Sequence, residues 1–517
     1  MIFDFLQRLT LLRRCLICFF SGGAMALAMP PFGFWPMLFF GIGTFYLCLI
    51  GQKRWPAFFT GWAFGFGYFL AGLFWIANAL LVPGNPFKWV WPLAILGLPV
   101  GLALFTGVAA WLSTLIARPE TKRGMLAFIV CLGGSEFLRG HIFTGFPWNL
   151  YAYGWAKSPA LSQVVSLVGA YGLSVLTIVI CCVPAWILAS HADRKTASIT
   201  FLVLITVLNA WFMWGTERIR NNPAQFHDSV TIRIVQPNIA QEDKWNEEKL
   251  GQNLTSMIGH STAPADSPEK TIIVWPETSI SDFITSDPSG AQFLKQSLFD
   301  RLPGALLATG MLRHQTNRIT GENQYYNSLV VLNSSLENLA VFDKTHLVPF
   351  GEYIPFKDII PLTPFVAFSG FTPGSGLQTL TADKIPSFSP LVCYEIIFPG
   401  NVTDKNNRPE WIINVTNDGW YGDSPGPYQH MTMAIFRAIE EGIPVARSAN
   451  TGVSVMIDPV GRVLKKIPYG AAGHFDTALP KRLENTTIYS RYGDTPLILF
   501  FVFALCALWM SRKQPRN

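Results

Sequence analysis

Long apolar runs at both ends of the chain constrain its fold more than any other feature of the sequence. A helix needs ~20 mostly apolar residues to cross the hydrocarbon core of a bilayer. Eight runs approach or exceed that length: Arg14–Met29, Phe34–Ile50, Ala57–Leu81, Val90–Ile116, Gly124–Leu138, Leu161–Leu188, Ala197–Met213 and Pro496–Met510. Charged residues make up only 14% of the chain, against about 25% in soluble proteins. The sequence therefore predicts a membrane protein with about eight transmembrane helices.

Lysine and arginine are concentrated in alternate loops between these runs. These cations are Arg8, Arg13, Arg14, Lys53, Arg54, Arg118, Lys122, Arg123, Arg194, Lys195, Arg512, Lys513 and Arg516. Cytoplasmic loops carry an excess of such residues, so both termini are expected in the cytoplasm. The pattern predicts transmembrane helices one to seven within residues 1–213, an extracytoplasmic domain within 214–494, and helix eight with a cytoplasmic tail within 495–517.

The polar segment contains short strand-like runs separated by Gly, Pro, Asn and Asp. These runs are "VTIRIVQPN", "TIIVWPE", "ALLATG", "NSLVVLN", "SPLVCYE", "WIINVTN", "PVARSAN" and "VSVMIDP". The segment Pro427–Gly442 has the apolar spacing of an amphipathic helix. Continuously apolar strands are typical of sheets that are covered on both faces. The polar segment is therefore expected to be a layered α/β domain.

Cys393 is the only one of eight cysteines that lies outside the apolar runs. It has no partner for a disulfide within the polar segment, so it is either a buried inert thiol or a reactive one. The eight histidines show no H-E-x-x-H motif or close pair, and we expect neither a metal nor another cofactor. The net charge of +6 resides in short loops between apolar runs, which argues against a nucleic-acid partner.

The membrane half contains one conspicuous pair of charges and one aromatic loop. Glu136 and Arg139 have the i, i+3 spacing of an ion pair on one helix face, and binding of a lipid head group is the alternative. The loop Thr144–Trp155 carries Trp148, Tyr151, Tyr153 and Trp155. Such residues are typical of an aromatic belt at the membrane interface.

Three polar residues lie where apolar strand-like runs meet turns. Glu277 ends "TIIVWPE", Lys344 lies in "VFDKTHLVPFGEY", and Cys393 lies in "SPLVCYE". Catalytic groups of α/β folds gather at strand ends. Taken singly, the three residues also have structural explanations as a helix cap, a snorkelling lysine and a packed thiol.

The order of the motifs W-P-E, D-K-x-H-L-V-P-F-G-E, V-C-Y-E and N-x-x-N-D-x-W-Y-G-D resembles the nitrilase superfamily, whose members carry a Glu-Lys-Cys triad in an αββα sandwich. With apolar spans on both sides, nearly the whole chain is similar to the apolipoprotein N-acyltransferases, the membrane-embedded branch found in the bacterial inner membrane. The resemblance implies that Glu277 is the general base, Lys344 the transition-state stabiliser and Cys393 the nucleophile.

The resemblance also implies supporting or substrate-binding roles for a second group of residues, which are Glu352, Trp245, Tyr394, Glu395 and Trp148. The implied reaction transfers a fatty acyl chain from a phospholipid to the α-amino group of the N-terminal diacylglyceryl-cysteine of an apolipoprotein. It proceeds by a ping-pong mechanism through a Cys393 thioester, on the periplasmic side of the bilayer. The expected partners are the bilayer, the phospholipid donor and the apolipoprotein acceptor, and the protein is expected to be a monomer.

The stretch Phe350–Gly376 is unusually apolar for a segment outside the membrane. Its Gly and Pro residues suit a mobile loop. One hypothesis is a lid that dips into the bilayer surface, and an ordinary hydrophobic cluster under a loop is equally compatible with the sequence. The lid residues would be Phe356, Ile359, Ile360, Phe365, Phe368 and Phe371.

Two other functions are compatible with parts of this pattern. A membrane-tethered amidase or nitrilase-type hydrolase would use the same triad with water as the acceptor. A transporter or sensor would use the polar domain to bind a ligand, but transporters usually place ionisable residues within their spans and show repeated halves.

Overall fold

The computed structural model describes residues 8–83, 85, 87–189, 194–264, 271–316, 321–355 and 370–511. The chain divides into two compact units. The helical unit falls within Met1–Leu80, Trp89–Asn222 and Thr487–Asn517, and the α/β unit within Leu81–Lys88 and Pro223–Thr486.

Eight principal helices make up the helical unit. They are α2 (Leu11–Met25), α3 (Pro36–Leu49), α4 (Arg54–Leu73), α6 (Trp91–Ile116), α7 (Lys122–Arg139), α9 (Val165–Ala189), α10 (Arg194–Asn221) and α16 (Thr495–Met510). Each of the eight predicted apolar runs overlaps one of them, although α10 continues beyond the expected end at Met213 as far as Asn221.

Five helical stretches among the described residues are long and apolar enough to cross a membrane. They are Leu11–Ala28, Arg54–Leu81, Lys88–Ile116, Val165–Ala189 and Arg194–Asn221. The apolar helices Pro36–Leu49 and Thr495–Met510 are shorter. At 1.5 Å per residue, the 14 residues of α3 extend only about 21 Å, less than the hydrocarbon core. The chain is a multi-pass membrane protein with about five membrane-length helices, and eight crossings remain a prediction.

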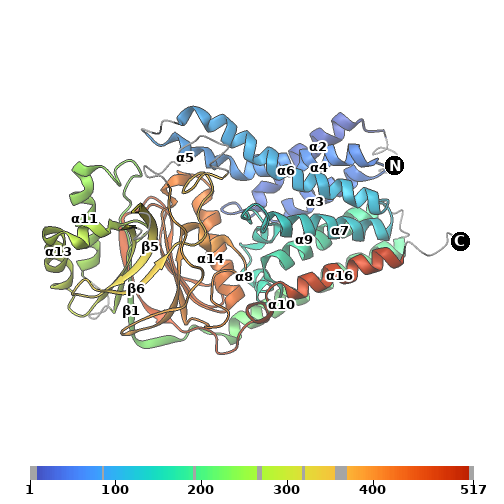
Figure 1. Ribbon diagram of the computed structural model, residues 1–517. Coiled ribbons are helices and arrows are strands. Elements are labelled where there is room, and N and C mark those ends of the chain that lie inside the picture. Colours follow the sequence, from blue (N-terminus) through green and yellow to red (C-terminus); the bar gives the residue numbers. More distant parts are fainter. Residues whose placement is uncertain are drawn as a thin grey trace. The chain divides into compact units, whose positions relative to one another are not determined.

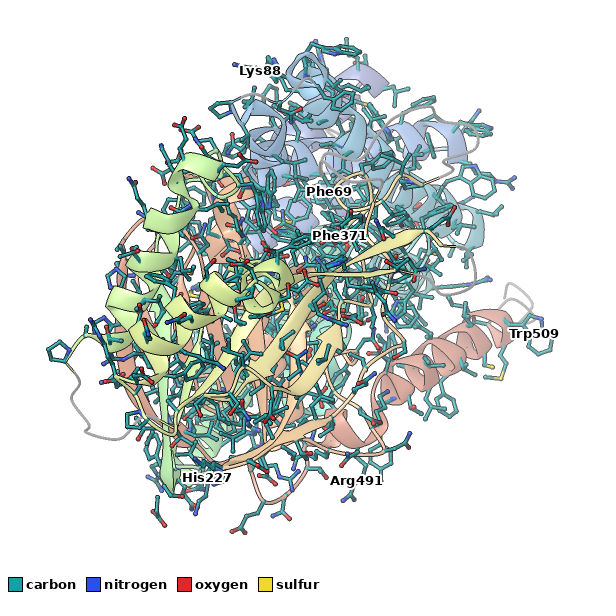
Figure 2. All side chains as sticks on the ribbon, turned by 60° about the vertical axis from the view of Figure 1, so that its left-hand side comes forward. Phe69, Lys88, His227, Phe371, Arg491 and Trp509 are labelled. Carbon is teal, nitrogen blue, oxygen red and sulfur yellow. The ribbon has the colours of Figure 1, made fainter. Side chains whose placement is uncertain are left out.

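Large apolar side chains cover the exposed surface of α10 and α16. On α10, Phe201, Leu202 and Val203 are all more than half exposed. Trp509 projects outward near the end of α16 (Figure 2). Contiguous apolar surface on this scale is typical of contact with lipid.

Two mixed sheets form the α/β unit. The first contains β1 (Phe226–Gln236), β2 (Ile272–Val274), β3 (Ile280–Ser281), β4 (Leu306–Thr316), β5 (Asn323–Leu332), β6 (Asn338–Asp343) and β13 (Gly473–Pro480). Its strand order is β13-β1-β2-β4-β5-β6, with β3 paired to β4. The second contains β7 (Leu380–Ala382), β8 (Ile385–Val392), β9 (Trp411–Thr416), β10 (Val445–Ala449), β11 (Ser454–Ile457) and β12 (Val463–Ile467), in the order β12-β11-β10-β9-β8-β7.

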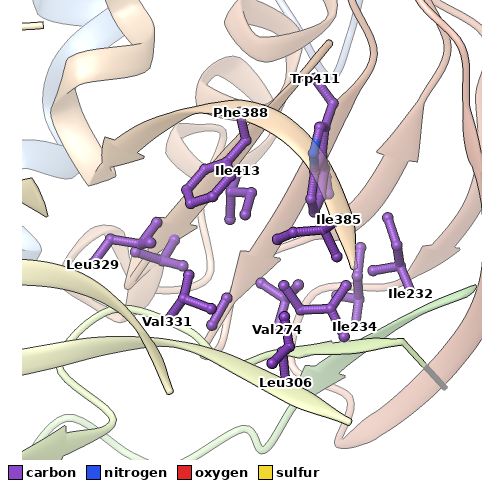
Figure 3. Close-up of a cluster of buried hydrophobic side chains, with 14 of the residues drawn as sticks. Ile232, Ile234, Val274, Leu306, Leu329, Val331, Ile385, Phe388, Trp411 and Ile413 are labelled. Atoms are coloured by element: carbon purple, nitrogen blue, oxygen red, sulfur yellow. The ribbon is translucent and has the colours of Figure 1, made fainter. Parts of the chain in front are cut away.

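The two sheets pack face to face over an apolar core. Figure 3 shows Val274 and Leu306 of the first sheet on one side of this core and Phe388, Trp411 and Ile413 of the second on the other. Alternate residues of the buried strands therefore point into the sandwich, as the period of two requires.

Helices cover the outer faces of both sheets. A second apolar cluster joins the first sheet to α11 (Glu247–Thr262) and α13 (Pro288–Leu294). Helix α14 (Gly426–Glu441) contacts β10 of the second sheet (Figure 1). The layer order is therefore αββα. The predicted layered α/β domain is confirmed, as is the amphipathic helix predicted at Pro427–Gly442.

Candidate active site

Glu277 follows strand β2 and lies 6% exposed in the α/β unit. Its backbone passes so close to β4 that a Cβ on Gly310 would lie 2.4 Å from Glu277 Cα. Glycine at position 310 is therefore required for this approach. Glu277 Oε1 accepts a hydrogen bond from Asn327 Nδ2 at 2.8 Å. Among the described residues, Glu277 Oε2 is buried without a hydrogen-bond partner.

Lys344 lies directly after β6 and is 1% exposed. Its Nζ is 2.9 Å from Glu352 Oε1, 2.8 Å from Glu352 Oε2 and 3.9 Å from Glu277 Oε1. Burial lowers the pKa of Lys344, but the hydrogen bond to Glu352 and the charges of Glu352, Cys393 and Glu277 together outweigh burial, so the pKa is raised above its usual value. Lys344 is therefore a fixed positive charge between two carboxylates.

Asn327 joins those two carboxylates from the other side. Its Nδ2 donates to Glu277 Oε1 at 2.8 Å and to Glu352 Oε1 at 2.9 Å. Asn327 is 2% exposed and lies on β5. Asn327 was not predicted as a site residue, because a lone Asn in a strand-like run has no local signal that separates it from a strand-end turn residue.

Cys393 begins the 3₁₀ turn η6 (Cys393–Ile397), directly after β8. Its φ of 52° lies in the left-handed region, which is uncommon for a residue with a side chain and recurs at active sites. Burial, and then the charge of Glu277, raise the pKa of the Cys393 thiol to about 12, while Lys344 partly opposes the rise. The sulfur is therefore a neutral thiol at neutral pH, within the electrostatic influence of both charges.

Glu395 ties the Cys393 turn to the Lys344 loop. Its Oε2 accepts from Val392 N at 2.8 Å, which caps η6. Its Oε1 accepts from Thr345 N at 2.8 Å and from His346 N at 3.1 Å. Because one carboxylate holds both segments, the positions of Cys393 and Lys344 are mechanically coupled.

Tyr394 and Trp245 differ in their surroundings. Tyr394 is 5% exposed, and its ring packs against His346 and Phe398. Trp245 is 45% exposed. It lines a cavity of about 440 Å³ together with Glu277 and Lys244.

Lys244 is a second buried lysine beside Glu277. Its Nζ donates to the main-chain oxygen of Glu277 at 2.7 Å. Burial lowers the pKa of Lys244 to about 8, and the charge of Glu277 opposes that effect. Lys244 was not predicted as a site residue, unlike its neighbour Trp245, since a lysine in a polar turn is usually solvated.

The cavity is mostly apolar away from its charged end. Leu250 and Leu254 of α11 form part of its wall, together with Ile280 of β3 and Phe283 and Ile284 of α12 (Asp282–Ser286). Its volume falls in the ~300–1,000 Å³ range of small-molecule sites. Glu277 and Lys244 therefore line this pocket, and Glu277 connects it to the buried Lys344, whose Nζ lies 3.9 Å from Glu277 Oε1.

In the helical unit, the predicted pairing of Glu136 with Arg139 is confirmed. The two side chains lie 2.9 Å apart and each residue is 2% exposed. Arg139 also donates to the main-chain oxygen of Trp148 at 2.8 Å. The pair therefore fixes the aromatic loop that follows α7.

The interfacial-belt prediction for that loop is wrong. Trp148, Tyr151, Tyr153 and Trp155 are all 3% exposed or less. Trp148 packs against Trp75, with ring centroids 5.0 Å apart. These side chains fill the interior of the helical unit, where Trp155 Nε1 donates to Thr177 Oγ1 at 2.8 Å.

Most of the predicted lid lies outside the described residues: Phe356, Ile359, Ile360, Phe365 and Phe368 fall within 356–369. Phe371 is described, and its backbone N–H donates to the main-chain oxygen of Glu352 at 3.0 Å. The lid hypothesis therefore stays a prediction.

Comparison with known proteins gives matches across both units. Residues 21–183 match the family model of the apolipoprotein N-acyltransferase N-terminal domain, and residues 231–485 match that of carbon-nitrogen hydrolases. The apolipoprotein N-acyltransferase of Rhodopseudomonas palustris is 37% identical, over 97% of this chain and 96% of the relative. That of Agrobacterium fabrum is also 37% identical, over 98% and 97% respectively.

Solved structures are similar to part of the chain. An amidase from Nesterenkonia sp. is 18% identical with a TM-score of 0.37, covering 54% of this chain and 99% of the amidase. Saccharomyces cerevisiae Nit3, of the nitrilase superfamily, is 18% identical with a TM-score of 0.36, covering 52% of this chain and 94% of that protein.

Proposed function

The chain belongs to the apolipoprotein N-acyltransferases, and on this premise we propose that it acylates the N-terminal α-amino group of a diacylglyceryl-cysteine lipoprotein. The acyl group comes from a phospholipid and is carried as a thioester on Cys393. Glu277 is the general base, Lys344 the transition-state stabiliser and Cys393 the nucleophile. The buried cluster of these three residues is the observation that carries the proposal.

In the first half-reaction, the sulfur of Cys393 attacks the ester carbonyl of the phospholipid. The thiol is neutral at rest, so its proton has to move as the C–S bond forms, and Oε2 of Glu277 is the acceptor. The C–O bond then breaks, and the leaving lysophospholipid oxygen takes that proton from Glu277. The acyl group remains on sulfur.

Charge develops on the carbonyl oxygen during this attack. Lys344 offsets it, and the loss of one such donor typically slows an enzyme about 10²–10³-fold. Glu352 and Asn327 support this role because their contacts fix the ammonium and the base. Glu395 holds the turn that carries Cys393 and the loop that carries Lys344 in fixed relative positions.

In the second half-reaction, the α-amine of the lipoprotein attacks the thioester. Its nitrogen loses a proton to Glu277 as the C–N bond forms. The C–S bond breaks, and the sulfur recovers the proton as a thiol. Thioesters are reactive toward amines, and an α-amine with a pKa of about 7.7–8.0 is partly unprotonated at neutral pH.

The apolar cavity beside Glu277 supports a lipid donor. We assign it to the acyl chain, with the reacting carbonyl at the end formed by Glu277 and Lys244. Trp245 and Tyr394 are then substrate-binding residues near the carbonyl, and the buried Trp148 has a supporting role within the helical unit.

The membrane portion keeps the enzyme beside two lipid-anchored substrates, since each buried CH₂ holds a chain in the bilayer by about 0.8 kcal/mol. Our proposal places the protein, as a monomer, in the bacterial inner membrane with eight crossings and both termini in the cytoplasm. Residues 214–494 then form the catalytic domain in the periplasm, between spans in 1–213 and 495–517. A reporter fused after Asn517 that functions only in the periplasm would contradict this orientation.

A hydrolase with the same triad is the alternative. Incubation of the purified protein with phospholipid vesicles, with or without a diacylglyceryl-cysteine peptide, distinguishes the acyltransferase from the hydrolase. The proposal predicts a stalled acyl-enzyme without the peptide and an N-acylated peptide with it. Steady release of free fatty acid in both cases would favour the hydrolase, and full function of Cys393→Ala in cells would favour a non-enzymatic role.

A further inference from the structure

Helix α14 contacts both ends of the turn that carries the nucleophile. His430 Nε2 lies 3.2 Å from the main-chain oxygen of Cys393. Arg437 Nη1 donates to the main-chain oxygen of Ile397 at 3.2 Å. His430 and Arg437 are seven residues apart, which places them on the same helix face about two turns apart. The helix therefore holds η6 at its first and last residues.

A buried ionic pair lies behind the imidazole. His430 Nδ1 is 2.9 Å from Asp418 Oδ1 and 3.1 Å from Arg447 Nη2. Arg447 Nη2 also donates to Asp418 Oδ2 at 2.8 Å. All three residues are fully buried.

These contacts define where the imidazole hydrogen lies. A carbonyl oxygen only accepts hydrogen bonds, so Nε2 has to carry a hydrogen to bind the oxygen of Cys393. Arg447 only donates hydrogen bonds, so Nδ1 of His430 can accept one from Arg447 when Nδ1 carries no hydrogen. Burial, and then the charge of Arg447, lower the pKa of His430, whereas Asp418 opposes them. In the neutral Nε2–H form Nδ1 accepts from Arg447, and in the charged form Nδ1–H donates to Asp418 Oδ1 instead; Nε2–H donates to the Cys393 oxygen in both forms.

We propose that His430 is a positioning residue for the nucleophile. Its Nε2–H holds the carbonyl of Cys393, and Asp418 and Arg447 together hold the imidazole at Nδ1. The proposal rests on the proposed function of Cys393 and adds to it the group that orients the sulfur.

The backbone of Cys393 explains why such a group is needed. A non-glycine residue keeps a φ of 52° only when its surroundings fix it. The direction of the Cα–Cβ bond, and hence the position of Sγ, follows from that backbone conformation. A misplacement of about 1 Å in a reacting group costs about 10²-fold in rate.

Two variants of similar polarity separate positioning from folding. In His430→Gln, the amide nitrogen takes the place of Nε2 and still reaches the carbonyl of Cys393. In His430→Asn, the amide takes the place of Nδ1 and leaves that carbonyl without its donor. Thr432→Val is the matched control on the same helix, because the Thr432 hydroxyl binds only the oxygen of Tyr428 one turn earlier among the contacts of the described residues.

The measured quantity is the rate of acyl-enzyme formation from phospholipid vesicles, together with donor KM and the melting temperature. His430→Asn should slow acylation by about 10²-fold at unchanged KM. His430→Gln should stay within about tenfold of wild type, and Thr432→Val should match wild type. Equal acylation rates for His430→Asn and His430→Gln would overturn the proposal. Acylation rates that simply follow the melting temperatures of the variants would also overturn it.

Alkylation of Cys393 by chloroacetamide separates this inference from the proposed function, because it needs no acyl donor. If wild type forms no acyl-enzyme, the proposed function fails, yet the Asn variant should still be alkylated more slowly than the Gln variant. If the His430→Asn variant does not fold, ¹⁵N-histidine spectra of the wild-type protein test the proposal instead. The His430 signal is the one that is absent from the spectra of His430→Gln. A hydrogen on Nε2 at neutral pH, in the neutral or the charged imidazole, supports the proposal, and a neutral tautomer with its hydrogen on Nδ1 overturns it.

Discussion

The sulfur of Cys393 is buried and protonated at rest, which distinguishes it from cysteines that react as preformed thiolates. Its pKa of about 12 follows mainly from burial. A catalytic thiol in this state depends on a base that accepts its proton during attack. Glu277 fits that need because its charge already acts on the sulfur and its Oε2 is not engaged by another described group.

Alkylation measured against pH tests the state of this thiol. Because its pKa is raised, the rate of chloroacetamide addition to Cys393 should still rise between about pH 8 and about pH 10, where an ordinary thiol of pKa ~8.5 levels off. Peptide mapping by mass spectrometry gives the rate at this cysteine. Glu277→Gln removes a charge that raises the pKa, so its curve should shift to lower pH. A wild-type plateau below about pH 9 would contradict the assigned state.

Glu352 is the main partner of Lys344, and its loss leaves a buried lysine with one distant carboxylate at 3.9 Å. Breaking a buried pair on one side costs about 3 kcal/mol. Glu352→Gln should therefore lower the free energy of unfolding by about that amount in chemical denaturation of the detergent-solubilised protein. Glu337→Gln, at an exposed pair with Asn333, should cost less than about 0.5 kcal/mol. Equal stability of the two variants would show that Lys344 does not depend on Glu352.

Among the secondary-structure elements, β3 and α12 form the apolar wall of the cavity beside Glu277. Ile284→Trp should fill part of that space and slow acylation by long-chain phospholipids by about tenfold or more, while short-chain donors react normally. Phe293→Trp, on the neighbouring helix α13 and outside the cavity lining, is the control. The measurement is the rate of acyl-enzyme formation across donors of different chain length. An equal loss of acylation rate for donors of all chain lengths would show that the cavity does not hold the acyl chain.

The eight strand-like runs quoted from the sequence coincide with β1, β2, β4, β5, β8, β9, β10 and β11. These strands are mostly buried and continuously apolar, so their pattern stands out. Strands β3, β6, β7, β12 and β13 are not among those eight runs, and β12, for example, reads "VLKKI" and is largely exposed. At the edge of a sheet, backbone pairing with a neighbour decides the structure, and local sequence carries little of that information.

The site shows the same division between local and long-range information. Glu277, Lys344 and Cys393 were found because ordered motifs surround them. Asn327 and Lys244 were missed because their importance comes from contacts across 50 and 33 positions of sequence. His430 was also missed, since an isolated histidine on an amphipathic helix has no pattern that marks its contact with Cys393.

At the scale of the whole molecule, the length of an apolar run in the sequence did not distinguish helices that are long enough to cross a membrane from shorter ones. Helix α7, which contains the predicted run Gly124–Leu138, carries Lys122, Arg123, Glu136 and Arg139 within 18 residues. The burial of Glu136 against Arg139 explains how such a helix tolerates its charges. The division into a helical and an α/β unit follows the change in composition along the chain.

The central claim is that Cys393 carries the acyl group between two lipid-anchored substrates. Intact-mass spectrometry of the protein after exposure to phospholipid vesicles, followed by peptide mapping, tests it most directly. We expect one added acyl mass on the peptide that contains Cys393, removed by the diacylglyceryl-cysteine peptide and absent from Cys393→Ala. An acyl mass on another residue, or its persistence in the Ala variant, would contradict the account.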